Sequence, residues 1–188
     1  MGENMNVLYI SNLTGNLFAG PNNSVPAQIK AQSKRDNVFW YNINDIKREE
    51  WKEINCYNLK DYPSGRLKDL PKPFNKPDIA VIEEFYCFPF CKIIKDINEN
   101  KIPYIIIPRS ELTKKAQKRK RVKKFIGNIC YFKKMANNAS AIQFLSKQEK
   151  VDSGDKWNKN DFIISNGISI PEEKRENFSK DKIRATYI

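Results

Sequence analysis

Short apolar runs alternate with polar or amphipathic stretches along most of the chain. Most of these runs are apolar at nearly every position, which is typical of strands buried on both faces of a sheet. In chain order they predict strands over Asn6–Ser11, Asn37–Asn42, Cys56–Leu59, Asp78–Ile82, Pro103–Ile107, Ser140–Leu145 and Asp161–Ser165.

The stretches between the runs predict helices. The polar residues Asn22, Asn23 and Ser24 suit the cap of a helix over Val25–Lys34, and a short helix is expected over Ile43–Lys52. Phe88–Glu99 would place its apolar side chains on one face of a helix. A long helix is predicted over Thr113–Asn137, because helical spacing relates Val122, Phe125, Ile126, Ile129, Phe132, Met135 and Ala136.

This alternation of strands and helices predicts an α/β fold with a doubly wound, mainly parallel, Rossmann-like sheet. In such folds, ligands bind beyond the carboxyl ends of the strands. We therefore expect the functional residues in the segments that leave the strands at that edge, namely Asn12–Gly20, Asn42–Asp45, Glu83–Phe85 and Pro108–Leu112.

The composition excludes several classes of protein. Of the 188 residues, 40% are hydrophobic, which is too many for a disordered chain. No histidine is present, so a Ser-His-Asp triad, a Cys-His pair and any histidine-containing metal site are excluded. The cysteines lack the paired spacing of a zinc site, so we expect no metal and instead buried, reduced thiols in a cytoplasmic protein, at Cys56, Cys87, Cys91 and Cys130.

The charge indicates an anionic partner. There are 34 Lys and Arg residues against 22 Asp and Glu residues, a formal net charge of +12. Much of the excess lies in one short run, which predicts contact with an anionic membrane surface or with nucleic acid; the alternative is a solvated helix face. The run consists of Lys114, Lys115, Lys118, Arg119, Lys120, Arg121, Lys123 and Lys124.

Three features at the expected ligand edge are candidates for binding. The loop from Gly15 to Gly20 could bring backbone N–H groups to a phosphate, although it matches neither the dinucleotide fingerprint nor the Walker A pattern. Glu83 or Glu84 could act as a base or bind a hydroxyl group. Arg109 could donate paired hydrogen bonds to phosphate or sugar oxygens. The alternatives are a flexible connection, a solvated carboxylate and a surface ion pair.

Two segments of the first two thirds of the chain resemble parts of one family. NVLYIS, followed by Gly15, Gly20-Pro21 and a helix, resembles that family's first strand and glycine-rich loop. IPRSELTKKAQKRKRVKK resembles a Pro-Arg-Gly segment that precedes a Lys-rich helix, with Ser110 in place of the glycine.

Two later segments extend the resemblance. NNASAIQFLSKQEK carries Ser146 and Glu149 of a Thr-Ser-x-x-Glu pattern, and FIISNGISIPEE is similar to an Asn-Gly interdomain segment, with Ser165 for proline and Ser169 for aspartate. In this order and spacing, the four segments together resemble the N-terminal domain of a retaining, family 4-type glycosyltransferase with the GT-B fold.

The resemblance implies that residues 1–165 form a Rossmann-like, acceptor-side domain. Residues 166–188 would then be the interdomain linker and the start of a donor-binding C-terminal domain, with Ala185–Ile188 resembling the opening of that domain's first strand. The rest of that domain would lie outside this chain, and this fragment would be inactive alone. The implied reaction moves a sugar from a nucleotide-diphosphate donor to a glycan or lipid-linked acceptor in surface polysaccharide synthesis, with no cofactor and no obligatory metal.

The resemblance also implies roles for the candidate residues. Gly15 and Gly20 would lie near the donor phosphates, and Glu83 and Arg109 would bind the acceptor. The basic run would dock at the inner face of the plasma membrane. The family's N-domain histidine has no counterpart here.

Two other classes remain open from the sequence. A nucleic-acid-binding α/β module would use the basic run Lys114–Lys124, although the chain has no KH loop and no aromatic RNP motif. A small flavodoxin-like regulatory domain would need an FMN loop or a phosphoacceptor aspartate after an early strand, and neither is evident.

Overall fold

A single parallel sheet organises the chain. Across residues 4–16, 18–46 and 48–167, which are those that the computed structural model describes, the sheet has seven strands, and every neighbouring pair is parallel. The strand order is β3-β2-β1-β4-β5-β6-β7, so the chain reverses its direction of travel across the sheet between β1 and β4, as in a Rossmann-like fold. The strands are β1 (Asn6–Ser11), β2 (Asn37–Asn42), β3 (Cys56–Asn58), β4 (Ile79–Glu83), β5 (Tyr104–Ile107), β6 (Ala141–Phe144) and β7 (Asp161–Ile163).

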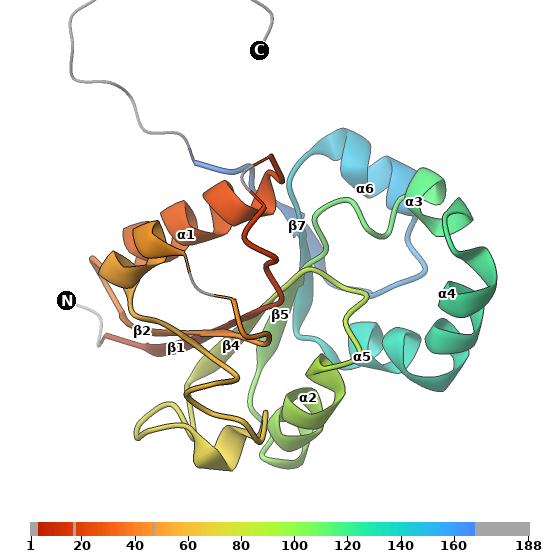
Figure 1. The fold of residues 1–188 in the computed structure, drawn as a ribbon. Coiled ribbons are helices and arrows are strands. Elements are labelled where there is room, and N and C mark those ends of the chain that lie inside the picture. Colours follow the sequence, from red (N-terminus) through yellow and green to blue (C-terminus); the bar gives the residue numbers. More distant parts are fainter. Residues whose placement is uncertain (1–3, 17, 47, 168–188) are drawn as a thin grey trace, which may run out of the picture.

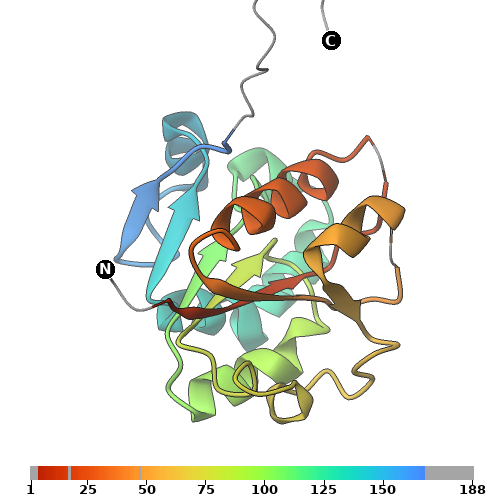
Figure 2. The same cartoon turned by 90° about the vertical axis from the view of Figure 1, so that its left-hand side faces the viewer.

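Helices cover both faces of this sheet, which confirms the predicted doubly wound α/β class. α1 (Pro21–Gln32) and the 3₁₀ helix η1 (Glu49–Ile54) pack on one face, while α2 (Phe90–Glu99) and α5 (Lys133–Asn138) pack on the other (Figures 1 and 2). The remaining elements are η2 (Leu67–Asp69), α3 (Lys114–Lys118), α4 (Arg121–Gly127), the π-helical turn η3 (Asn128–Phe132) and α6 (Lys147–Ser153).

Successive residues of each strand supply opposite layers of the core. In β1, Leu8 and Ile10 belong to the layer beneath α2, whereas Val7 and Tyr9 belong to the layer beneath α1. All four side chains are buried. The apolar run of β1 is therefore a strand with two buried faces, whereas the edge strand β7 has no buried residue. The predicted positions agree with the seven strands to within two residues.

The start of α1 differs from the prediction. The helix begins at Pro21, not Val25, with Gly20 as its N-cap. Proline suits the first helical position because it has no N–H to leave unsatisfied and its φ is already helical. Asn22 therefore lies inside the first turn, where its side chain accepts a hydrogen bond from the Gly15 N–H and donates to the Asn16 carbonyl.

The predicted helix over Ile43–Lys52 is also wrong. The 3₁₀ helix η1 occupies Glu49–Ile54, and a turn precedes it. In that turn the side chain of Asn44 accepts from the Ile46 N–H and donates to the Leu13 carbonyl. These bonds give the backbone a partner that competes with helix formation.

The predicted long helix over Thr113–Asn137 is broken once: α3 is separate, whereas α4, η3 and α5 follow one another without a gap from Arg121 to Asn138. The break lies at Lys120, which has a φ of 54°, a left-handed value that ends α3 and starts α4. No residue of α3 is buried, so no packing holds this basic stretch in line with the rest. Farther on, Gly127 allows η3 to form, because a Cβ atom there would come within 3.0 Å of the Phe132 ring.

A buried amide fixes the loop that leaves β1. The Oδ1 atom of Asn42, at the end of β2, accepts from the Ser11 hydroxyl at 2.8 Å and from the Leu13 N–H at 2.7 Å. Its Nδ2 atom donates to the Leu13 carbonyl at 3.1 Å, and the Trp40 indole donates to the same Ser11 hydroxyl. Because the Asn42 side chain is fully buried, each of these bonds is sheltered from water.

We predict that Asn42→Ala lowers the free energy of unfolding by about 2–4 kcal/mol, since it leaves buried donors and acceptors without partners. Asn37→Ala is the matched control: Asn37 lies in the same strand but is exposed, so its loss should cost less than about 1 kcal/mol. Urea denaturation measures both values, and equal losses for the two variants would contradict the role of Asn42.

Candidate functional site

Four segments meet at the carboxyl edge of the sheet. β2, β1, β4 and β5 are neighbours in that order and run in parallel, so the segments after them lie along one edge. The prediction that Asn12–Gly20, Asn42–Asp45, Glu83–Phe85 and Pro108–Leu112 leave the same edge is therefore confirmed by the topology.

A buried ion pair lies at the centre of this edge. The Arg109 Nε atom donates to the Glu83 Oε2 atom at 2.8 Å, and the two side chains are only 4% and 0% exposed. The other carboxylate oxygen of Glu83 is buried and has no hydrogen-bond partner among the described residues. Burial raises the pKa of Glu83, and the adjacent guanidinium opposes that rise.

The guanidinium of Arg109 also joins other elements. Its Nη1 atom donates to the Ser24 hydroxyl at 3.0 Å and to the Asn166 Oδ1 atom at 3.1 Å. Its Nη2 atom donates to the Gln28 Oε1 atom at 3.3 Å. Arg109 thus connects the end of β4, α1 and the segment after β7, and it is not the surface ion pair considered as an alternative.

The backbone around the ion pair is strained. Glu84, Arg109 and Ser110 have φ values of 75°, 48° and 66°, in the left-handed region that residues other than glycine rarely adopt. Each of the three lies within three residues of the end of β4 or β5, and these two strands are neighbours in the sheet. Such strain persists only where surrounding contacts enforce it, and it is concentrated at functional sites.

Two carboxylates, Glu111 and Glu149, hold the strained backbone in place. The Oε2 atom of Glu111 accepts from the Phe85 N–H at 2.5 Å and from the Tyr86 N–H at 2.9 Å. Glu149 accepts from the N–H groups of Ser110 and Leu145. Neither role was predicted from the sequence, although Glu149 was noted in the Ser-x-x-Glu pattern, whose Ser146 caps α6 by accepting from the Glu149 N–H.

Glu84 is a partly buried carboxyl group at this edge. Burial first, and then the nearby charges of Glu111 and Glu83, raise its pKa to about 8, although a hydrogen bond from the Asn12 backbone opposes the rise. At neutral pH the side chain is therefore mostly a neutral acid that can donate a hydrogen bond. The described residues contain no cluster of cysteine or carboxylate side chains suited to a metal ion.

The two candidate glycines lie in the loop before α1, in different situations. Gly15 has a φ of 75°, and a Cβ atom there would come within 2.9 Å of the Ile46 side chain, so the position requires glycine. Its N–H donates to Asn22 within the protein. Gly20 has open space around its Cα, and its carbonyl accepts from the Ser24 hydroxyl that also contacts Arg109. The loop therefore connects to the ion pair through Gly20 and Ser24.

The basic run lies on separate helices. Lys114, Lys115 and Lys118 belong to α3, Arg119 and Lys120 form the break, and Arg121, Lys123 and Lys124 belong to α4. All except Lys124 are exposed. Lys124 is folded inward, with its ammonium group 4.4 Å from the centre of the Tyr86 ring and donating to the Ala116 carbonyl, and burial lowers its pKa.

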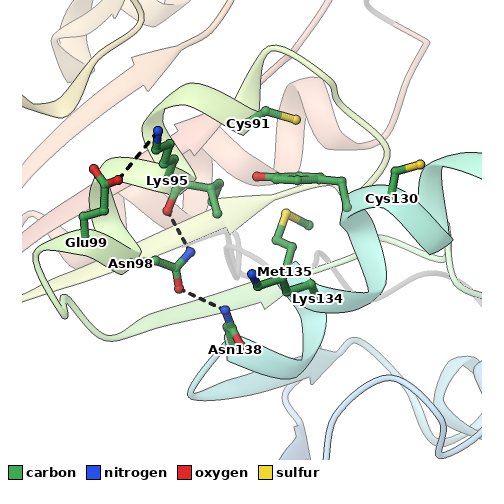
Figure 3. A pocket seen from close by; sticks show the side chains of 10 residues that line it. Cys91, Lys95, Asn98, Glu99, Cys130, Lys134, Met135 and Asn138 are labelled. Carbon is green, nitrogen blue, oxygen red and sulfur yellow. Dashed lines mark hydrogen bonds and ion pairs between the residues drawn. The ribbon is translucent and has the colours of Figure 1, made fainter.

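Two hollows were not predicted from the sequence. One, of about 400 Å³, lies at the carboxyl ends of β2 and β3 and is lined by Asp45, Ile46, Asn58, Lys60 and Asp61. The other, of about 580 Å³, separates α2 from η3 and α5; Figure 3 shows Cys91, Lys95, Asn98 and Glu99 on one side and Cys130, Lys134, Met135 and Asn138 on the other. Their linings join residues far apart in the sequence, which periodicity cannot relate.

The cysteines are free thiols, but the expectation that all four are buried is wrong. Cys56 and Cys87 are buried, Cys91 is partly buried and Cys130 is exposed. Burial raises the pKa of Cys87 to about 12, so this thiol is unreactive at neutral pH.

The comparisons with known proteins leave the family open. No protein-family model matches the sequence, and no curated protein matches it significantly.

We predict that Arg109→Gln lowers the free energy of unfolding by about 3–5 kcal/mol, because it leaves the Glu83 carboxylate buried without a counter-charge. Arg35→Gln, at an exposed position, should change it by less than about 0.5 kcal/mol. A double variant, Glu83→Gln with Arg109→Gln, should recover part of the loss. Denaturant titration measures all three, and a loss below about 1 kcal/mol for Arg109→Gln would contradict the assignment.

The raised pKa of Glu84 predicts a pH-dependent stability. Between the ordinary value of 4.5 and about 8, the folded state holds a proton that the unfolded state releases, so stability falls as the pH rises through this window. The free energy of unfolding should drop by about 1–3 kcal/mol between about pH 6 and pH 9. Glu84→Gln should flatten this slope, and an unchanged slope in that variant would show that another group titrates.

Proposed function

We propose that the chain is the acceptor-side, Rossmann-like half of a retaining glycosyltransferase of the GT-B type. One observation supports this most strongly. The four segments that carry the sequence resemblance converge on Arg109 and Ser110: Ser24 of α1 and Asn166 accept from the Arg109 side chain, and Glu149 accepts from the Ser110 N–H. The strand order and the parallel sheet are compatible with one half of such a fold.

In this proposal a second α/β domain follows residue 188 and holds the nucleotide-diphosphate sugar. Residues 166–188 serve as the connection; of these, only Asn166 and Gly167 lie within the described residues, so the Ser169 and Ala185–Ile188 parts of the resemblance fall outside them. The contact between Arg109 and Asn166 fixes the start of that connection against the acceptor-side domain.

The proposed chemistry is transfer of the sugar to a hydroxyl group of a glycan or lipid-linked acceptor in surface polysaccharide synthesis. Negative charge develops on the departing diphosphate, and Gly20 would contribute a backbone donor that stabilises it. The neutral Glu84 carboxyl is suited to hydrogen-bond an acceptor hydroxyl. Glu83 and Arg109 form an ion pair with each other. They would therefore position the segments after β4 and β5 rather than touch the substrate.

The proposed location is the cytoplasmic side of the plasma membrane. A lipid-linked acceptor is anchored in the bilayer, and the exposed lysines and arginines of α3 and α4 would face its anionic surface.

The test is glycosyl transfer by the complete product of the reading frame. The protein is expressed with everything encoded after Ile188 and incubated with isolated membranes and a panel of radiolabelled nucleotide sugars. We expect label to enter the glycan or lipid fraction, and Glu84→Ala, which removes the hydrogen-bonding group, to lower kcat by about tenfold or more. Glu53→Ala, at an exposed site on η1, is the matched control and should leave the rate unchanged.

Two results would overturn the proposal. One is a reading frame that encodes no second α/β domain after Ile188. The other is a complete protein that transfers no sugar from any nucleotide sugar in the panel while remaining folded by circular dichroism.

A further inference from the structure

Four apolar side chains share one face of a helix, a pattern typical of a buried face, but here they lie on the surface. Val122, Phe125, Ile126 and Ile129 are between 56% and 72% exposed. They follow the spacing i, i+3, i+4, i+7 along α4 and η3, so they form one continuous strip, which we call the apolar stripe. The core contacts of this region come instead from Phe132, Met135 and Ala136.

The surroundings of the apolar stripe are apolar and basic. The exposed ring of Phe88 packs against Phe132 and lies close to Gly127, at the edge of the stripe. No Asp or Glu occurs between Glu111 and Glu149 in the sequence. The exposed basic side chains before, within and after the span of the stripe are Lys114, Lys115, Lys118, Arg119, Lys120, Arg121, Lys123, Lys133 and Lys134, which we call the basic flank.

The position of the stripe leaves it accessible. α4 lies at the outer side of the fold, away from β1 and β2 (Figure 1). α3 contributes no buried residue and α4 buries only Gly127, so the core does not use this surface. Isolated exposed apolar side chains are ordinary, but contiguous ones bordered by charge mark a binding surface.

The charge of the basic flank and the hydrophobicity of the stripe together distinguish among three kinds of partner: nucleic acid, a second copy of the chain and an anionic bilayer. Nucleic acid would neutralise the basic flank but would place its phosphates beside four aliphatic or aromatic side chains. A second copy of the chain would bring two basic flanks together, and like charges at an interface repel. An anionic bilayer offers phosphate headgroups to the lysines and arginines and an acyl layer directly beneath them for the stripe.

We propose that the apolar stripe inserts into the interfacial layer of an anionic lipid bilayer, while the basic flank binds the headgroups. This inference deepens the proposed function by naming the docking surface and its partner, but it requires no sugar transfer. The helices lie in the plane of the membrane; none of the helices in the described part of the chain has the length and hydrophobicity to cross it.

The experiment measures binding to lipid vesicles and insertion depth. Vesicles contain phosphatidylcholine with about one third phosphatidylglycerol, or phosphatidylcholine alone. The variant Phe125→Trp reports insertion, because the natural residues Trp40, Trp51 and Trp157 are buried in the core, away from any lipid. We expect its emission to shift to the blue and to be quenched by brominated acyl chains, with the anionic vesicles only.

Two further variants separate the contributions. Phe125→Ser with Ile129→Ser should weaken vesicle binding by about tenfold or more, because it removes apolar area that the bilayer would bury and leaves the charge unchanged. Ile164→Ser is the matched control, since Ile164 is also exposed but lies after β7, away from the stripe. Lys118→Glu, Lys120→Glu and Lys123→Glu together should abolish binding to the anionic vesicles.

The outcomes distinguish the alternatives. Vesicle binding that the serine variant leaves unchanged would overturn insertion. Oligonucleotide binding with a steep salt dependence, with no change in the emission of the Phe125→Trp variant on adding vesicles, would assign the surface to nucleic acid. Dimerisation that the serine variant abolishes, without vesicle binding, would assign it to a second copy. Because no nucleotide sugar is present, failure of the transfer assay leaves this result intact.

Discussion

The ion pair between Glu83 and Arg109 is the constraint on which the carboxyl edge of the sheet depends. Removing both charges from water is costly, and the cost is offset only if the guanidinium finds enough acceptors. The acceptors of Arg109 are Glu83 at the end of β4, Ser24 and Gln28 in α1, and Asn166 after β7. The Arg109 backbone takes a left-handed conformation, and the carboxylates of Glu111 and Glu149 hold the neighbouring peptide groups. The pairing of one buried charge thus sets the shape of the loops after β4 and β5.

The strands could be predicted from the sequence because a parallel strand buried on two faces is an uninterrupted apolar run. Helices were predicted less well. Their apolar pattern indicates which side chains share a face, but not whether that face packs against the core. Val122 and Phe125 are three residues apart, as are Phe132 and Met135, yet only the latter pair is buried. The break at Lys120 depends on the lack of packing around α3, which is a tertiary property.

The candidate site was predicted in outline for a related reason. Topology brings segments after neighbouring parallel strands together, so Gly20, Glu83 and Arg109 could be assigned to one edge. Their partners could not, because Asn166 is 57 residues from Arg109 in the sequence and Glu149 is 39 residues from Ser110. The raised pKa of Glu84 likewise results from burial and from neighbouring carboxylates that only the fold brings close.

The packing of α3 and α4 has a consequence for how this protein can evolve. A substitution in a core strand changes the free energy of unfolding, whereas α3 buries no residue and α4 buries only a glycine. Selection for stability therefore acts weakly on these two helices. The charge and hydrophobicity of this surface can drift, and can adapt to a different binding partner, without loss of the scaffold that bears the carboxyl edge.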